Sequence, residues 1–404
     1  MSLTPTAVTA GSIPAHVPPQ LAFDFDMYVL PEAYGSDPHA YWKAVQDSYP
    51  DIFWTPAYGG HWVALRGEDI KTIQSDFEQF SNAGAFIPKG LSPVLIPEHL
   101  DPPEHTPFRK LIMPYFLPNA LKELEEKARR IAIDIIEELR PQGECEFVTD
   151  FSSVMPVLAF LHLAGLPEED MPMLKGWGKL MSPANNPRAP EGWAKFVAYV
   201  TEWIERCKTE PRPGLINAIA HAEVNGQPLT DEQRISMATL AVSGGLDTVM
   251  LMTSFTAHHL AQHPEDRKYL REHPEKIPDA VEEFGRRFGT SNLSRDVRSD
   301  LVYKGIEMKK GEQVMMPFPL YGLDDRIYER PMEVDFNRPS FRHTSFGTGP
   351  HTCPGAMLAR REITIFLQEW LTRIPEFRVK PGTAPVCGVG LINTIGNLQL
   401  EWDV

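Results

Sequence analysis

The strongest chemical signal in the sequence lies around Cys353, within a run rich in glycine and proline from Phe346 to Gly355. This composition predicts a tight loop, and the strong helix formers that follow it predict a helix. We expect Cys353 at the N-cap of that helix, with Pro354 at its first position. A thiolate at the positive end of a helix dipole has a lowered pKa, which favours binding of a soft metal ion. The alternative is a lone cysteine buried in a turn, which is the commoner fate of a cysteine.

An acid and an alcohol interrupt a long apolar helical pattern at Asp247 and Thr248. They follow the pair Gly244-Gly245 within a segment that we expect to form one helix from Asp231 to about Gln262. Each glycine costs a helix about 1 kcal/mol relative to alanine, so packing or function must compensate. A hydroxyl group backed by a carboxylate can pass protons from solvent to a reaction centre. Close packing against a neighbouring helix is the alternative explanation.

Three further groups of charged residues could act together. Glu283 and Arg286 lie one helical turn apart and can form an ion pair. His105 and Arg109 follow a proline-rich segment, and Arg295 stands near a predicted small sheet. Taken singly, each of these residues is as well explained by ordinary surface charge.

Taken together, these residues resemble the cytochrome P-450 family. The pattern Phe-x-x-Gly-x-His-x-Cys-x-Gly that ends at Gly355 is similar to the family's haem-binding loop, and Glu283 with Arg286 resembles its Glu-x-x-Arg pair. The resemblance covers nearly the whole chain and, within the family, is greatest to the bacterial enzymes that hydroxylate camphor. The stretches that carry it beyond the motifs are 23–28, 59–62, 163–170, 244–249 and 371–375.

The resemblance implies a haem b cofactor, iron protoporphyrin IX, with Cys353 as the axial thiolate and metal ligand. Thiolate ligation pushes electron density onto the iron and favours cleavage of an O–O bond. Asp247 and Thr248 are then the catalytic pair that delivers protons, and Glu283 with Arg286 is a structural pair. The other implied cofactor-binding residues are His105, Arg109, Arg295, Phe346, Gly349, His351 and Gly355, of which the cations hold the propionates.

The implied activity is that of a haem-thiolate monooxygenase that uses O2 to hydroxylate an unactivated C–H bond of a small terpenoid. The segment from Phe86 to Leu100 lacks the tyrosine that binds the ketone in camphor enzymes, and Leu293 stands where those enzymes have an aspartate. A compact apolar pocket suits a bicyclic monoterpenoid of the cineole or camphor type. The expected pocket residues are Phe86, Leu95, Leu240, Ser243, Gly244, Leu391 and Ile392. The alternatives are a haem-thiolate isomerase or dehydratase, which needs no acid and alcohol pair, and a non-enzymatic haem sensor.

The resemblance also implies an electron-transfer partner. An iron-sulfur ferredoxin, reduced by an NADH-dependent flavin reductase, would deliver electrons at a basic patch on the cysteine side of the haem. A basic patch on an acidic chain suits an acidic ferredoxin. The expected docking residues are Lys71, Arg109, Arg338, Arg342, Arg360 and Arg361.

The elements that must position these residues are mainly helical. Apolar periodicity and capping signals predict helices over about 37–46, 119–140, 151–164, 188–208, 231–262 and 278–288. Short strands are expected in a hairpin over 53–65 and in three runs between Leu301 and Met316. The predicted fold class is mainly α with minor antiparallel β, the cytochrome P-450 fold, as one large domain over 37–404. Residues 1–36 are expected to form a loosely held N-terminal arm.

Composition limits the alternatives. The chain has 404 residues and a formal net charge of −15, which disfavours nucleic acid and anionic membrane surfaces as partners. We see no stretch of about 18 apolar residues and no signal peptide. The four cysteines lie far apart and suggest neither disulfides nor a zinc site. We therefore expect a soluble cytoplasmic protein.

Overall fold

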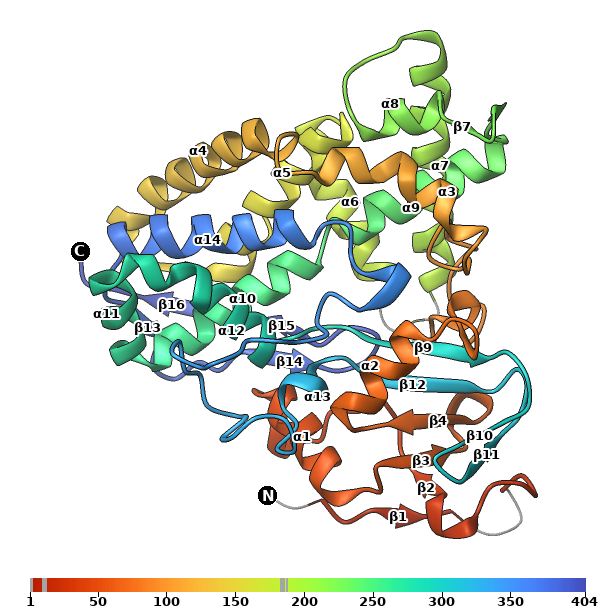
Figure 1. Cartoon of the computed structure of the whole chain (residues 1–404). Helices are drawn as coiled ribbons and strands as arrows, with labels where there is room; N and C mark the ends of the chain where they lie inside the picture. Colours follow the sequence, from red (N-terminus) through yellow and green to blue (C-terminus); the bar gives the residue numbers. More distant parts are fainter. Residues whose placement is uncertain (1–2, 9–12, 182–185, 187) are drawn as a thin grey trace.

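Helices form most of the computed structural model, and a small sheet lies along one side of them (Figure 1). The structure describes residues 3–8, 13–181, 186 and 188–404. The helices are α1 Pro38–Ser48, α2 Gly67–Ser75, α3 His105–Ile112, α4 Leu121–Leu139, α5 Met155–Ala164, α6 Met171–Met181, α7 Ala189–Thr209, α8 Leu215–Ala220, α9 Asp231–Gly244, α10 Thr248–Gln262, α11 Pro264–Glu272, α12 Ile277–Arg287, α13 Pro319–Gly322 and α14 Ala356–Arg373. The prediction of a mainly helical chain with minor sheet is confirmed.

The principal sheet has five strands in the order β3-β4-β12-β9-β5. Its pairs are antiparallel except β4 with β12, where Trp62 lies opposite Val314 in parallel register, so the sheet is mixed where we predicted antiparallel pairing throughout. The strands are β1 Thr6–Ala7, β2 Phe23–Asp24, β3 Ile52–Thr55, β4 His61–Ala64, β5 Phe80–Ser81, β6 Glu144–Glu146, β7 Glu223–Val224, β8 Gln227–Pro228, β9 Asn292–Val297, β10 Leu301–Tyr303, β11 Ile306–Met308, β12 Gln313–Pro317, β13 Arg378–Val379, β14 Val386–Gly388, β15 Thr394–Gly396 and β16 Gln399–Glu401.

Local signals fixed several helix ends as predicted. The Asp37 side chain accepts hydrogen bonds from the backbone N–H groups of His39 and Ala40 at the start of α1. Thr230 and Gln233 form a capping box at the start of α9. Because capping satisfies backbone donors that the helix itself leaves free, these short motifs determine where each helix begins.

The long helix expected from Asp231 to Gln262 is two helices, α9 and α10, so that prediction is wrong. The break falls over 245–247, where a Cβ atom on Gly245 would lie 2.4 Å from the Phe160 ring, so only glycine allows α5 to pack this closely. Residues 231–262 are, by length and composition alone, apolar enough to cross a membrane, which our search for apolar stretches missed. In the structure α10 packs against α5, α12 and α14 as an inner helix.

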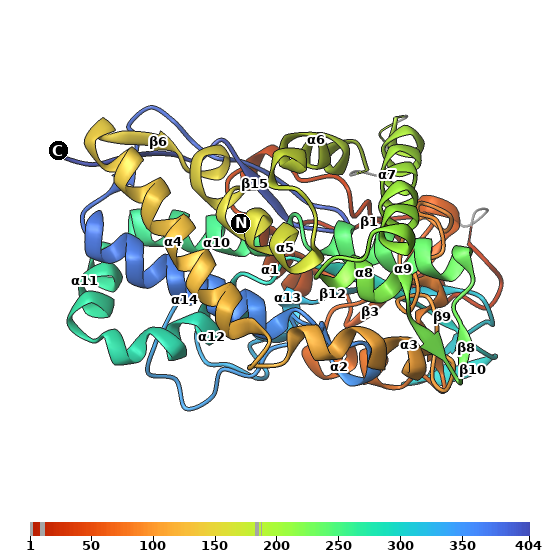
Figure 2. The same cartoon turned by 90° about the horizontal axis from the view of Figure 1, so that it is seen from above.

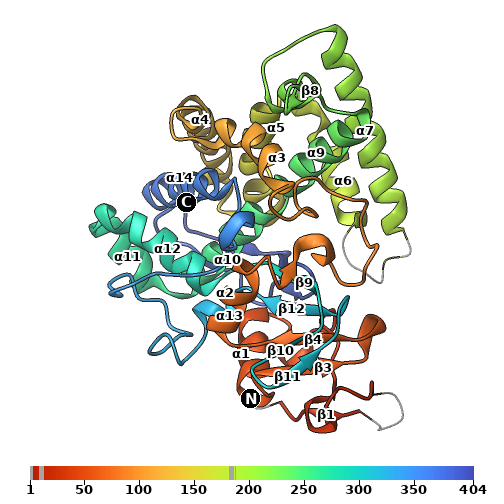
Figure 3. The same cartoon turned by 45° about the vertical axis from the view of Figure 1, so that its right-hand side comes forward.

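The helices surround α10 on several sides. Seen from above, α4 lies across α14, with which it is in contact (Figure 2). The view in Figure 3 shows α9 beside α7 and α8, its contacting neighbours. This arrangement leaves the break between α9 and α10 facing the loop that leads into α14.

The N-terminal arm is held more firmly than its composition suggested. Its strand β2 pairs with β1, and the backbone of Ala22 bridges to Trp54 of the principal sheet. Ala22, Phe25 and Met27 are buried in the core on this side of the molecule. The described part of residues 1–36 therefore packs on the domain that follows it.

Candidate active site

One cavity of about 390 Å³ collects nearly all of the predicted site residues. It lies between the junction of α9 with α10 and the loop before α14, and its lining is mostly apolar. The predicted residues that line it are Phe86, Leu95, His105, Arg109, Leu240, Ser243, Gly244, Asp247, Thr248, Arg295, Phe346, His351, Cys353, Gly355, Leu391 and Ile392. Residues separated by up to about 300 positions in the chain are thus brought to one enclosed space.

The cysteine loop closes through its backbone before α14 begins. The Cys353 N–H donates to the carbonyl oxygen of Phe346 at 2.7 Å, and the Ala356 N–H donates to the carbonyl oxygen of Cys353 at 3.3 Å. The helix therefore begins at Ala356 with Gly355 as its N-cap, not at Pro354 after Cys353 as predicted. The extra turn places the sulfur ahead of the helix terminus.

Gly349 anchors this loop against α2. Its φ is +71°, and a Cβ atom would lie 2.9 Å from the Cα of Ser75, so only glycine fits here. The neighbouring Thr348 hydroxyl shares a hydrogen bond of 2.8 Å with the Ser75 hydroxyl. Gly349 does not line the cavity; it holds in place the loop that carries Cys353 and His351.

The thiol of Cys353 is accessible from the cavity although protein surrounds it. Burial raises its pKa, and this effect exceeds the opposing influence of a hydrogen bond from the Gly355 N–H and of the charges on Arg109 and Arg360. The predicted lowering of this pKa is therefore wrong for the free thiol. A coordinated metal ion deprotonates a thiol outright, so a buried and accessible sulfur remains suited to be a ligand.

Four cationic or ionisable groups converge on the cavity with incomplete partners in the protein. The rings of His105 and His351 lie 4.3 Å apart, and neither Nε2 atom has a hydrogen-bond partner among the residues that the structure describes. Arg295 is buried and donates to the backbone carbonyl of Ser294 at 2.8 Å. Arg109 donates to the carbonyl of Thr352.

The pKa values of Arg295 and His351 are both lowered, which means that their surroundings in the protein disfavour the protonated, positively charged forms. Burial lowers the pKa of Arg295 to about 10. Burial, followed by the charges on Arg295, His105 and Arg109, lowers the pKa of His351 to about 3. An acceptor with two carboxylates would satisfy these donors and offset their repulsion. The site therefore fits the two propionates of a haem whose iron lies at Cys353.

The acid and alcohol lie at the start of α10, on the cavity wall. The Thr248 hydroxyl donates to the carbonyl oxygen of Gly244 at 3.4 Å. Burial raises the pKa of Asp247 despite the nearby positive charges of Lys175 and Lys179. The carboxylate lies beside Gly178 of α6, so it is positioned between the cavity and the lysine-bearing face of α6.

Glu283 and Arg286 pair on α12 and are fully buried, at 2.7 and 2.8 Å. A third residue completes the group, because Arg338 donates to the same carboxylate at 2.9 Å. The Arg338 side chain is only 6% exposed, so its predicted role in ferredoxin docking is wrong. Arg338 lies 55 residues from Glu283 in the chain, so no local spacing in the sequence indicated this pair.

The remaining predicted docking cations differ in how free they are. Lys71 and Arg342 are exposed. Arg360 pairs with Glu282 and stacks over the Phe346 ring, and Arg361 pairs with Glu125 at 2.9 Å. Arg109 faces the cavity instead of the surface patch.

Sequence reasoning missed Glu362, which lines the cavity from α14. It is buried, its Oε1 atom has no hydrogen-bond partner within the described ranges, and burial raises its pKa well above the ordinary value. The four-residue step from Leu358 to Glu362 and on to Phe366 follows the apolar face of the helix. A carboxylate among apolar residues on one helix face is the sequence signal that could have indicated this buried acid.

Comparison with known proteins gives consistent matches over the chain. The family model described as cytochrome P450 matches residues 286–386. A probable cytochrome P450 127A1 of Sinorhizobium fredii is 32% identical, covering 98% of each chain. Linalool 8-monooxygenase of Pseudomonas putida is 28% identical over 85% of this chain and 90% of its own. Among solved structures, those of CYP101J2 and cytochrome P450 CYP101C1 are 38% and 37% identical with TM-scores of 0.88 and 0.89, each covering 97% of this chain and 100% of that chain.

Proposed function

The chain belongs to the cytochrome P450 family and is a haem-thiolate monooxygenase with haem b as its cofactor, and from this premise we propose that it hydroxylates a small bicyclic monoterpenoid. The observation that carries the proposal is the compact apolar part of the cavity. Its walls offer Phe86, Leu240 and Leu391 to a rigid hydrocarbon frame. One of the relatives, linalool 8-monooxygenase, is named for a terpene alcohol, which supports a terpenoid substrate.

The cofactor would be held by Cys353 at the iron and by His105, Arg109, Arg295 and His351 at the propionates. When bound, the haem supplies the activation of O2 for insertion into an unactivated C–H bond. The chain's own part in the reaction is to move protons and exclude water. We assign proton delivery to the Thr248 hydroxyl, with Asp247 as the group that renews its proton from solvent.

A polar contact would orient an oxygen-bearing substrate. The indole Nε1 of Trp193 is buried, has no hydrogen-bond partner among the described residues, and belongs to a residue that lines the cavity. Tyr28 also lines the cavity, but its hydroxyl donates to the Ile87 carbonyl at 2.5 Å. An ether or ketone oxygen would satisfy the free indole donor. Cineole and camphor each carry one such acceptor on a bicyclic frame.

Electrons would come from an iron-sulfur ferredoxin reduced by an NADH-dependent flavin reductase. We assign docking to Lys71 and Arg342, which are exposed, and to Arg360, which is partly exposed and pairs with Glu282. The expected location is the cytoplasm, where such redox proteins are available to a soluble enzyme.

The test is a titration of the purified ferric protein with cineole, camphor and the bicyclic hydrocarbon pinane, followed by haem absorption. We expect a saturating change of spin state with cineole or camphor. Trp193→Phe should weaken that binding by about three- to tenfold, the loss of one hydrogen bond, and leave pinane unchanged. If none of the three compounds changes the spectrum, the terpenoid class is wrong.

Turnover tests the proton-delivery assignment with ferredoxin, reductase and NADH present. Thr248→Val should lower product formation by about 10²-fold while substrate binding stays intact. Ser243→Ala is the matched control, because this hydroxyl lies on the same wall and donates to the Leu240 carbonyl at 3.2 Å. Equal loss in both variants would contradict the specific role of Thr248.

A further inference from the structure

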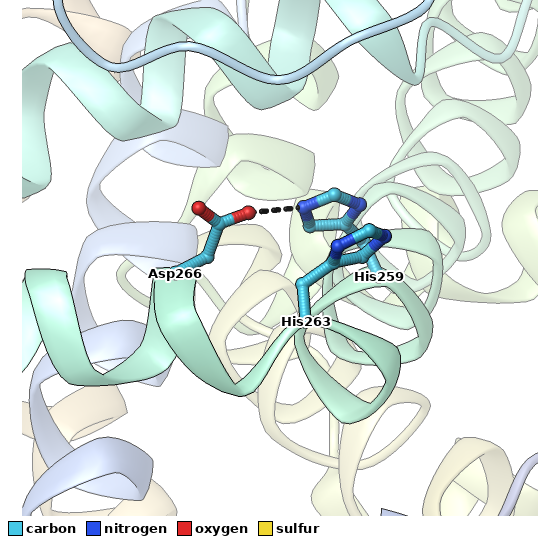
Figure 4. Close-up of side chains that lie close together, drawn as sticks. All are labelled: His259, His263 and Asp266. Atoms are coloured by element: carbon cyan, nitrogen blue, oxygen red, sulfur yellow. Dashed lines mark hydrogen bonds and ion pairs between the residues drawn. The ribbon is translucent and has the colours of Figure 1, made fainter.

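A second group of ligand side chains lies at the junction of α10 with α11, outside the haem cavity (Figure 4). His259, His263 and Asp266 each place one ligand atom within 4.8 Å of the others. The His259 Nε2 and an Asp266 oxygen already lie 2.7 Å apart. Neither the sequence motifs nor the proposed monooxygenase reaction uses these residues.

The turn between the two helices brings the three side chains together. His259 lies in the last turn of α10, His263 is the residue between the helices, and Asp266 lies in the first turn of α11. Pro264 starts α11 and fixes the change of direction. The spacing of four and then three residues therefore places all three groups on one side of the corner.

We propose that this corner is a binding site for a divalent transition-metal ion, most suitably Zn²⁺, with two imidazole nitrogens and one carboxylate oxygen from the chain as ligands. Zinc prefers four ligands of this kind at about 2.0–2.1 Å, which places ligand atoms roughly 3.3 Å from one another in a tetrahedron. The atoms here require shifts of no more than about 1.5 Å to reach that spacing. The fourth position is left to water.

The ring geometry shows which residue must move. The His259 and His263 rings are stacked 4.1 Å apart at an angle of 19°, and one ion cannot lie in the plane of two parallel stacked rings. The His263 side chain is 44% exposed and can rotate, whereas His259 is 11% exposed and packs against Phe284 and Phe288. Binding therefore replaces the stack by a tilted pair, with His263 as the mobile ligand.

A carboxylate beside His263 supports this assignment. An oxygen of Glu265 lies 3.0 Å from the Nδ1 atom of His263. This contact fixes the tautomer that carries its proton on Nδ1 and leaves Nε2 free to bind a metal ion. Histidine ligands of zinc commonly have such a carboxylate partner behind the ring.

The corner also opens onto a separate cavity of about 530 Å³, which gives an ion a way in and water a place to complete its coordination. The cation that faces this cavity is Arg287, and Asp37 lies 3.5 Å from it and offsets its charge. The other ionisable residues that line this cavity, besides the three proposed ligands, are His39, His258, Glu265 and Glu333. Because Asp37 offsets the charge of Arg287, the charges around the cavity do not repel a divalent cation strongly.

The chain contains its own control for this site. The sequence His-Pro-Glu occurs at His263 and again at His273, where Glu275 lies 3.3 Å from the histidine Nδ1. At the second turn, the positions equivalent to His259 and Asp266 are Tyr269 and Lys276. The two turns thus share their local chemistry and differ in the two additional ligands.

The test is calorimetric titration of the untagged ferric holoenzyme with ZnCl₂ in a buffer that does not bind zinc. We expect one equivalent of zinc per chain, binding at least tenfold weaker in His263→Ala and Asp266→Asn, and unchanged binding in His273→Ala. An unchanged haem spectrum in each variant shows that the fold is intact. Absence of saturable binding, or equal binding in His263→Ala and wild type, would overturn the proposal.

A second measurement identifies the ligands and the consequence of binding. X-ray absorption at the zinc edge should show nitrogen and oxygen ligands with the multiple scattering of two imidazoles. Zinc should also raise the melting temperature of the wild type, because an ion that binds only the folded state stabilises it and joins α10 to α11. A spectrum without imidazole scattering would contradict the site. These results do not depend on which terpenoid the enzyme oxidises.

Discussion

Two groups of buried charged residues in this protein differ in whether the chain itself supplies their partners. Around Glu283, both carboxylate oxygens accept hydrogen bonds from Arg286, and Arg338 completes the group within the chain itself. At the haem cavity, the charge of Arg295 lowers the pKa of nearby His351, whose Nε2 atom has no hydrogen-bond partner among the described residues. The comparison shows that charges satisfied by the chain hold the fold, whereas charges left unsatisfied mark where an external anion binds.

Energetics explains why both arrangements are stable in the same molecule. Burying an ion is costly unless a partner of opposite charge and further hydrogen bonds compensate for the lost water. The Glu283 group has those partners: Arg286 also donates to the carbonyl oxygens of Pro331 and Glu333 at 2.7 and 2.8 Å. For Arg295 and His351, the compensation must come with the cofactor.

The largest expected effect comes from breaking the group that the chain satisfies. Glu283→Gln leaves two buried guanidinium groups without their carboxylate and should lower the free energy of unfolding by about 3–5 kcal/mol. Urea denaturation of the holoenzyme measures this loss. Glu282→Gln is the matched control, since this neighbouring side chain is 33% exposed and its pairs with Arg360 and His343 should each contribute no more than about 1 kcal/mol. Equal effects of the two variants would refute the distinction.

The second prediction concerns Arg295 at the cavity, where loss of a charge should stabilise the apoprotein instead of destabilising it. Arg295→Met removes a buried charge that forms no ion pair with a carboxylate among the described residues, so it should raise the stability of the apoprotein by about 1–3 kcal/mol. The same change should weaken haem binding by about ten- to a hundredfold, because a charged hydrogen bond to a propionate is lost. Denaturation of the apoprotein and transfer of haem to an acceptor protein measure the two effects. A less stable apoprotein would mean that Arg295 supports the fold and not the cofactor.

This contrast also separates what the sequence could predict from what it could not. Local spacing predicts the loop around Cys353, the pair of Glu283 with Arg286 and the cap at Asp37. Arg338 was misassigned to the surface because its partner is 55 residues away in the chain. The sequence offered close helix packing as one explanation of Gly244-Gly245, but the partner, Phe160 of α5, lies far away in the chain and has no local signal.

The pocket shows the same limit. The seven residues that the resemblance implies for the pocket line one cavity, yet the resemblance pointed neither to Trp193, whose indole nitrogen has no partner among the described residues, nor to the buried Glu362. Both depend on which polar atoms lack partners after folding. Which polar atoms lack partners is decided by packing in the folded structure, and residue spacing in the sequence does not predict it.

Glu362 gives the third prediction, a pH dependence. Burial raises its pKa in the folded state above the unfolded value of 4.5, so the contribution of Glu362 to stability is most favourable below about pH 4.5 and is lost as the pH rises towards the folded pKa. The loss is about 1.4 kcal/mol for each unit between the two pKa values. Glu362→Gln should abolish this decline, which melting temperatures measured from about pH 5 to pH 8 would show.

A carboxylate on the same helix provides the control for Glu362. Glu369 is also largely buried, but it pairs with Arg129 and with Arg373. Its replacement by glutamine should destabilise the protein at neutral pH, because it removes a partner from two arginines. If both variants shift stability in the same direction at neutral pH, partner satisfaction does not explain the difference between them.

The smallest effect is expected for charges that water satisfies. Arg342 is exposed on the proposed ferredoxin face, and Arg342→Glu should slow reduction of the haem by about three- to tenfold at low salt. The difference should shrink as ionic strength rises, since exposed charges are screened over a Debye length of about 10 Å at 0.1 M salt. Arg271→Glu, on α11 and paired with Glu376 at 3.0 Å, is the control and should leave the rate unchanged. Equal slowing by both reversals would mean that net charge, and not a docking face, governs electron transfer. A slower reduction of the haem in Arg342→Glu alone, with unaltered stability, would complete the comparison. Charges that pair within the chain then support the fold, and charges that pair with the cofactor support the site. Charges that are hydrated at the surface are available to a partner protein.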